Sequence, residues 1–182
     1  MSIESYDRKV SKGIAGEKKP VCFVAAIEQL VPQSLPANVY KEYEQFINWY
    51  SPMRREKREQ ENDAMEEIFN KVFRSIGGLT CQDVYWKRVH TARGLTTVVN
   101  RLMREDYSVT VDVNDRNMCH TIGLLPLPDG KHYALTGNHI PPKLPPIATL
   151  QDIAPHLMIN GDRHMTRFPF NDSNVLGIPP VD

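Results

Sequence analysis

The first hundred residues of the chain place apolar side chains at intervals of three and four, the spacing of amphipathic helices. This spacing predicts helices over residues 22–31, 39–50 and 65–76. The pair Gly77-Gly78 is expected to end the third helix, because glycine readily takes the backbone conformation in which helices terminate. The mixed charge run over 53–64 is interpreted as a solvated helix face, with a partner-binding patch as the alternative.

The pattern then changes from a helical to an alternating period. After a short predicted helix over 95–103, the segment YSVTVDV alternates and predicts a half-buried strand. The segments CHTIGLLPLP and HYALTGN flank Asp129-Gly130, which is a strong hairpin signal. The last forty or so residues are rich in proline and are predicted to wrap irregularly over the surface.

Helices followed by antiparallel strands predict an α+β fold, in which N-terminal helices pack on a C-terminal antiparallel sheet. The prediction for the domains is a flexible arm over 1–19 and a single domain over 20–182. Within that domain, residues 20–105 are expected to be mostly helical and 106–140 to form the strands. Residues 141–182 are expected to be the irregular, Pro-rich tail.

The composition excludes several classes of protein but does not indicate one function. The 182 residues include 22 basic and 22 acidic side chains, so no global field favours nucleic acid as a partner. No apolar run is long enough for a membrane span, and no apolar signal-peptide core is seen, so we expect no membrane association. Three cysteines without CxxC spacing argue against disulfides and structural zinc, and favour a reducing compartment such as the cytoplasm.

One candidate constellation is carried by Cys22, His120 and Asn138. Cys22 begins a predicted helix, where unpaired N–H groups and the helix dipole stabilise a thiolate. His120 opens one strand of the predicted hairpin, and Asn138 returns nearly level with it on the other strand. An ideal two-residue turn would set His120 opposite His139, so a three-residue loop is needed to bring Asn138 there. Asn138 could then accept the imidazole N–H and orient the ring toward the thiol.

These two segments resemble a known family. VCFVAAIEQL looks like the nucleophile helix of papain-like cysteine peptidases, particularly viral leader proteases and bacterial effector peptidases, which are delivered to a host cytosol. HTIGLLPLPDGKHYAL is similar to their histidine hairpin. The resemblance implies a papain-like fold, a protein or peptide substrate and no cofactor or metal, with Cys22 as nucleophile and His120 as general base. Thr136 aligns with the family's third residue as well as Asn138 does.

The chain departs from that family before the cysteine. The family usually carries Gln or Asn five or six residues earlier to complete the oxyanion hole, where this sequence has Gly16 and Glu17. Cys81 is a rival nucleophile, because Thr80 could cap a helix that begins there. Cys119 is interpreted as a core residue, since side chains of neighbouring strand residues point to opposite faces.

Two further patterns are weaker alternatives. Cys119, His132 and His139 could bind a metal ion, although no pair among them has the spacing of a helical or knuckle ligand pair. Asp112 and Asp115 in VDVND are placed like the carboxylates of nucleotidyltransferases, but the Gly-Ser motif of those enzymes is absent.

We therefore interpret the sequence as that of a thiol-dependent acyl-transfer enzyme that hydrolyses peptide or isopeptide bonds. A deamidase or transglutaminase would use the same constellation and differ only in the nucleophile that resolves the thioester. The alternative from another class is a non-catalytic interaction protein that contacts its partner through the charged helix 53–64 and the Pro-rich tail. In that case Cys22 is a small buried residue of its helix.

Overall fold

The predicted N-terminal helices form where their apolar spacing places them. The computed structural model describes residues 21–116, 118–158 and 173–181, so the predicted arm over 1–19 lies outside the described residues. The helices are α2 (Cys22–Leu30), α3 (Ala37–Tyr50), α4 (Arg55–Gln60), α5 (Asn62–Ser75), α6 (Ala92–Arg104), α7 (Leu150–Ile153) and the 3₁₀ helix η1 (Ala154–His156). None of the described helices is long and apolar enough to cross a membrane.

The strands form one antiparallel sheet, which confirms the α+β class. They are β1 (Tyr85–Arg88), β2 (Ser108–Asp115), β3 (Met118–Pro126), β4 (Tyr133–Thr136), β5 (Ile147–Ala148) and β6 (Asn174–Ile178). Their order across the sheet is β1-β6-β2-β3-β4-β5. Strands β2 and β3 pair over their length, from Val109 opposite Leu124 to Asp115 opposite Met118.

The part predicted to be mostly helical, residues 20–105, also contains strand β1. The stretch 141–182, where no strand was predicted, contains strands β5 and β6. Strand β6 pairs with β1 on one side and β2 on the other. All five of its residues are buried, so NVLGI is a central strand, and such strands are continuous apolar runs without alternation. The apolar run NVLGI was not recognised as a strand because the sequence around it is rich in proline.

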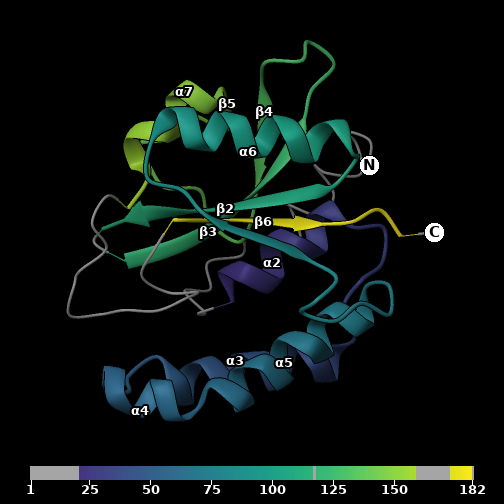
Figure 1. Cartoon of the computed structure of the whole chain (residues 1–182), viewed down its shortest axis with the longest axis vertical. Helices are drawn as coiled ribbons and strands as arrows, with labels where there is room; N and C mark the ends of the chain where they lie inside the picture. Colours follow the sequence, from purple (N-terminus) through teal and green to yellow (C-terminus); the bar gives the residue numbers. More distant parts are fainter. Residues whose placement is uncertain (1–20, 117, 159–172, 182) are drawn as a thin grey trace.

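Helices cover both faces of the sheet. Figure 1 shows α6 and α7 on one face and α2 on the other, with α3, α4 and α5 beyond α2. Side chains alternate accordingly along β2. Val109, Val111 and Val113 join the buried cluster that includes Leu95 and Leu102 of α6. Thr110 and Asp112, also buried, therefore point to the α2 face.

Helix α2 is fixed to β3 and β4 by a close and specific contact. A side chain at Gly123 would overlap the Thr136 hydroxyl and Leu30, so glycine there lets the helix approach the sheet. Gln29 of α2 donates to the Gly137 carbonyl at 3.1 Å and accepts from the Gly137 N–H at 3.0 Å. The Thr136 hydroxyl donates to the Ala26 carbonyl at 3.3 Å. These bonds set where Cys22, at the other end of α2, meets the sheet.

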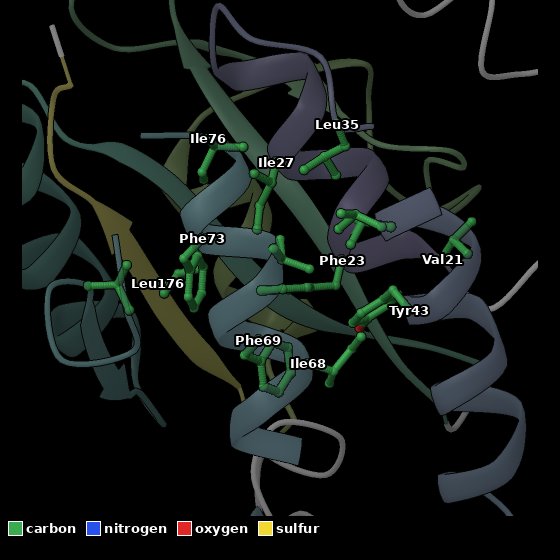
Figure 2. Close-up of a cluster of buried hydrophobic side chains, with 14 of the residues drawn as sticks. Val21, Phe23, Ile27, Leu35, Tyr43, Ile68, Phe69, Phe73, Ile76 and Leu176 are labelled. Atoms are coloured by element: carbon green, nitrogen blue, oxygen red, sulfur yellow. The ribbon is translucent and has the colours of Figure 1, made fainter. Parts of the chain in front are cut away.

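An aromatic cluster around Phe23 joins α2 to the helices beyond it (Figure 2). The Phe23 ring lies 5.0 Å from the Phe69 ring and 5.8 Å from the Tyr43 ring, measured between centroids. Trp86 of β1 stacks on it from the sheet at 6.2 Å. Tyr50 of α3 is buried, whereas its neighbour Trp49 is 48% exposed.

Replacing Phe23 with alanine should therefore lower the free energy of unfolding by about 3–5 kcal/mol, the usual loss for a buried phenylalanine. Trp49→Ala is the matched control, since it removes a larger ring that is half exposed, and its effect should be below about 1 kcal/mol. Urea denaturation followed by circular dichroism measures both. Equal losses in the two variants would contradict the packing described here.

Candidate thiol–carboxyl site

Cys22 is the first residue of α2, as the sequence predicted. The residue before it, Val21, has no side-chain acceptor for the helix start. The first hydrogen bond of the helix runs from the Ala25 N–H to the Val21 carbonyl at 2.9 Å. The backbone N–H groups of residues 22–24 therefore have no carbonyl of their own helix to bind. The Cys22 sulfur therefore lies beside backbone N–H donors that have no acceptor within their own helix.

The sheet residue that meets this sulfur is Thr121 of β3. The backbone N–H of Thr121 donates to the Cys22 sulfur, and the Thr121 hydroxyl oxygen lies where it can accept from the Cys22 S–H. The Thr121 hydroxyl also donates to Oδ1 of Asp112 at 2.6 Å. Asp112 lies directly opposite Thr121 in the β2–β3 ladder. A thiol, a hydroxyl and a carboxyl are thus connected in series.

Asp112 is the buried end of this series. It is 4% exposed, and its carboxyl group also accepts hydrogen bonds from the side chain and backbone of Asn174 in β6. Burial raises the pKa of Asp112 to about 7, against the lowering effect of the bonds from Thr121 and Asn174. The carboxyl group therefore gains and loses its proton near neutral pH, which suits a general base.

The thiol itself is not activated by the helix start. Burial raises the pKa of Cys22, the neighbouring Asp112 charge raises it further, and the bonds from Thr121 only partly oppose this. The sequence led us to expect a thiolate, because the helix dipole lowers a thiol pKa. Removal from water outweighs the dipole here, so Cys22 is a neutral thiol at neutral pH.

His120 lies on the opposite face of the sheet from Cys22. It is opposite Val113 in the ladder, and it shares its orientation with Ile122 and Leu124, which pack in the cluster beneath α6. Thr121, one residue along, takes the other orientation and meets the cysteine. The structure therefore does not bring the predicted Cys22–His120 pair together.

His120 instead bonds within its own hairpin. Its Nε2–H donates to the His139 carbonyl at 2.6 Å, because a carbonyl oxygen can only accept. Burial lowers the pKa of His120, which keeps the ring neutral at neutral pH. On the same hairpin, His139 Nε2 lies 3.2 Å from Oδ2 of Asp115.

The hairpin register explains why Asn138 does not face His120. Pro126 pairs with Tyr133, which is the register of a two-residue turn at Asp129-Gly130 and not that of a three-residue loop. Continued along the strands, this register sets His139 level with His120 and Asn138 level with Thr121. The alternative third residue, Thr136, faces α2, where its hydroxyl bonds to the Ala26 carbonyl. Neither residue is placed to orient His120.

The rival candidates are also placed by the fold. Cys81 lies in a turn and begins no helix. Its Sγ contacts the Glu66 carbonyl at 3.8 Å, and burial raises the pKa of its thiol. Cys119 is half-buried on the α2 face, two residues before Thr121. Within the described part of the chain, no group of three or more His, Cys, Asp or Glu side chains could hold a metal ion.

The sequence pointed to Asp112 as a carboxylate of interest but not as a partner of Cys22. In YSVTVDV it is the only carboxylate in an alternating strand, and alternation alone assigned it to a solvated face. That face is covered by α2, whose apolar surface is broad enough to pack on both the sheet and the helices beyond it.

Comparison of the chain with protein-family models, curated proteins and solved structures found no match.

The raised pKa of Asp112 makes a prediction about stability. An unfolded carboxyl ionises near pH 3.8 and the folded one near pH 7, so its stabilising contribution is complete below about pH 3.8 and is lost as the pH rises through about 7. As the pH rises from 5 to 8, ionisation of Asp112 should lower the parent's free energy of unfolding by roughly 2–3 kcal/mol. The Asp112→Asn protein should not show this loss.

Urea unfolding of both proteins at pH 5 and pH 8 measures this difference. Asp63→Asn, an exposed carboxylate in α5, is the control and should behave as the parent does. A parent and an Asp112→Asn protein with the same pH dependence would show that Asp112 ionises normally.

Proposed function

We propose that the protein catalyses thiol-dependent acyl transfer, with Cys22 as nucleophile and Asp112 as the base that acts through Thr121. The observation that carries the proposal is the Thr121 hydroxyl, which bonds to the Cys22 sulfur and lies 2.6 Å from the Asp112 carboxylate. A neutral thiol needs a base at the moment of attack, and a carboxyl group with a pKa of about 7 supplies one.

The chemical step moves two protons along this series. As the sulfur attacks a carbonyl carbon, its proton passes to the Thr121 oxygen, and the Thr121 hydroxyl proton passes to Asp112. The tetrahedral intermediate then collapses to a thioester and expels an amine, which receives the proton back by the same route. Water, entering with the same assistance, hydrolyses the thioester and restores the thiol.

The surroundings of Cys22 support this role. Cys22 as a residue is half-buried, whereas Asp112 and Thr121 are 4% and 6% exposed, so Cys22 is the member of the series that lies nearest the surface, although its thiol is largely removed from water. The N–H groups at the start of α2 lie beside it, and such groups stabilise the oxyanion formed when a carbonyl is attacked.

The substrate class follows from the resemblance to papain-like cysteine peptidases, which favours peptide or isopeptide bonds in a protein. The segment VCFVAAIEQL carries that resemblance at the nucleophile. The proposed base differs from the family's histidine. Deamidation and transglutamination would proceed through the same thioester. The group that is released and the nucleophile that resolves the thioester distinguish these reactions from hydrolysis of a peptide bond.

An activated ester tests the proposal without knowledge of the natural substrate. With 4-nitrophenyl acetate, the parent should form a thioester on Cys22, detected by mass spectrometry, at a rate that rises through about pH 7 as Asp112 ionises. Asp112→Asn and Thr121→Val should each slow this acylation about a hundredfold, the lower range for loss of general-base catalysis.

His120→Gln is the discriminating control, because it alters the histidine that the sequence favoured and should change the rate less than about threefold. Cys22→Ala should remove the modification. If His120→Gln slows acylation as much as Asp112→Asn does, His120 is the base and the assignment of Asp112 fails. If Cys22 of the parent is acylated no faster than Cys81, the protein is not a thiol enzyme.

A second candidate function is non-catalytic binding of a protein partner. This function is favoured by the half-exposed Trp49 of α3, whose ring centroid lies 5.9 Å from that of Phe46 on the same helix. The charged helix α4 follows α3 in the chain. A half-exposed tryptophan with an aromatic neighbour is typical of binding surfaces. The acylation experiment separates the two functions, since an unreactive Cys22 in a folded protein leaves this one.

A further inference from the structure

A groove of about 620 Å³ lies between α6 and the β3–β4 hairpin, away from Cys22. Helix α6 covers the face of the sheet opposite α2 (Figure 1), so the groove and the thiol series lie on different sides of the molecule. Its volume is that of a site for a small organic molecule. Nothing in the acyl-transfer step uses it.

The α6 wall of the groove is made of hydrogen-bond donors. Thr96, Thr97, Asn100 and Arg104 line it. The helix sequence, ARGLTTVVNRLMR, has three arginines and no acidic residue. Arg104 is exposed, and it has no ion-pair partner among residues 21–116, 118–158 and 173–181. Its guanidinium group is therefore available to a ligand that carries negative charge.

The hairpin wall adds His132 and Tyr133. Oδ2 of Asp129 holds Nδ1 of His132 at 2.6 Å, which fixes the ring and leaves Nε2 for another partner. The Tyr133 ring is buried, and its hydroxyl has no hydrogen-bond partner in the described part of the chain. The hydroxyl oxygen is not itself buried, so it is open to a ligand in the groove.

The remaining lining is apolar and carries no carboxylate. Met103, Pro126 and Leu127 complete the groove together with the Tyr133 ring. Asp129, next to the lining residue Gly130, is occupied by the His132 ring and by the N–H groups of Lys131 and His132, each N–H at 2.9 Å. Donors on one side and apolar surface on the other select a molecule that has an oxyanion at one end and a flat apolar part at the other.

We propose that this groove binds a small organic oxyanion of that kind, with Arg104 on the anionic group and Met103, Leu127 and the Tyr133 ring on the apolar part. The donors Thr97, Asn100 and His132 share the oxygen atoms of the anion. Phosphate monoesters and carboxylates present the same chemistry to these donors, so the experiment includes one of each.

Phenyl phosphate, benzoate and benzyl alcohol are titrated into the ¹⁵N-labelled protein, and amide shifts are followed by NMR. The two anions should shift amides of α6 and of residues 126–133, and benzyl alcohol should bind at least about fivefold more weakly. Arg104→Ala should weaken the anions about tenfold, the effect of losing one charge-assisted hydrogen bond. Arg93→Ala, an exposed arginine of the same helix outside the groove, should leave the affinity unchanged.

Binding of only one anion identifies the oxyanion class and supports the site. Equal binding of benzyl alcohol and the anions, equal effects of Arg104→Ala and Arg93→Ala, or shifts that lie elsewhere would each overturn the proposal. The Cys22→Ala protein should bind as the parent does, so the groove is tested independently of the acyl-transfer function.

Discussion

The packing of α2 across β3 and β4 is the constraint on which the rest of the structure depends. It needs a residue without a side chain at Gly123, and it is locked by the paired bonds between Gln29 and the Gly137 backbone. Buried bonds of this kind are costly to break, because both partners would be left without water. With the helix fixed at this end, its first residue meets Thr121, and Phe23 points into the aromatic cluster.

The same packing decides the electrostatics of the site. Helix α2 covers Asp112 and removes it from water, which raises the pKa of the carboxyl group to about 7. It also buries the thiol that a solvent-exposed helix start would have acidified. At neutral pH the thiol is therefore protonated and the carboxyl group is about half ionised, and the Thr121 hydroxyl lies between them. The two groups do not form an ion pair.

Much of the fold was predictable from local sequence, because amphipathic spacing reports which face of an element is buried. Amphipathic spacing predicted the helices α2, α3 and α5, and alternation predicted the strand β2. Strand β6 was missed because a strand buried on both faces has no alternation. At the site, Cys22 could be placed at a helix start, but its partner could not be identified. His120 and Thr121 are adjacent in sequence and opposite in orientation, and only the hairpin register and the position of α2 determine which one meets the thiol.

The central position of β6 has a consequence for the order in which the molecule is assembled. The strand lies between β1 and β2, so those two elements have no contact through the sheet until the chain has been made as far as residues 174–178. Asn174 of the same strand completes the hydrogen bonds of Asp112. During synthesis, the N-terminal helices therefore emerge long before the sheet that they pack on can close, and such long-range pairing is slow. Asp112 therefore lacks the two hydrogen bonds from Asn174 until β6 is inserted, so the surroundings of the buried carboxyl group are completed only when residues 174–178 have been made.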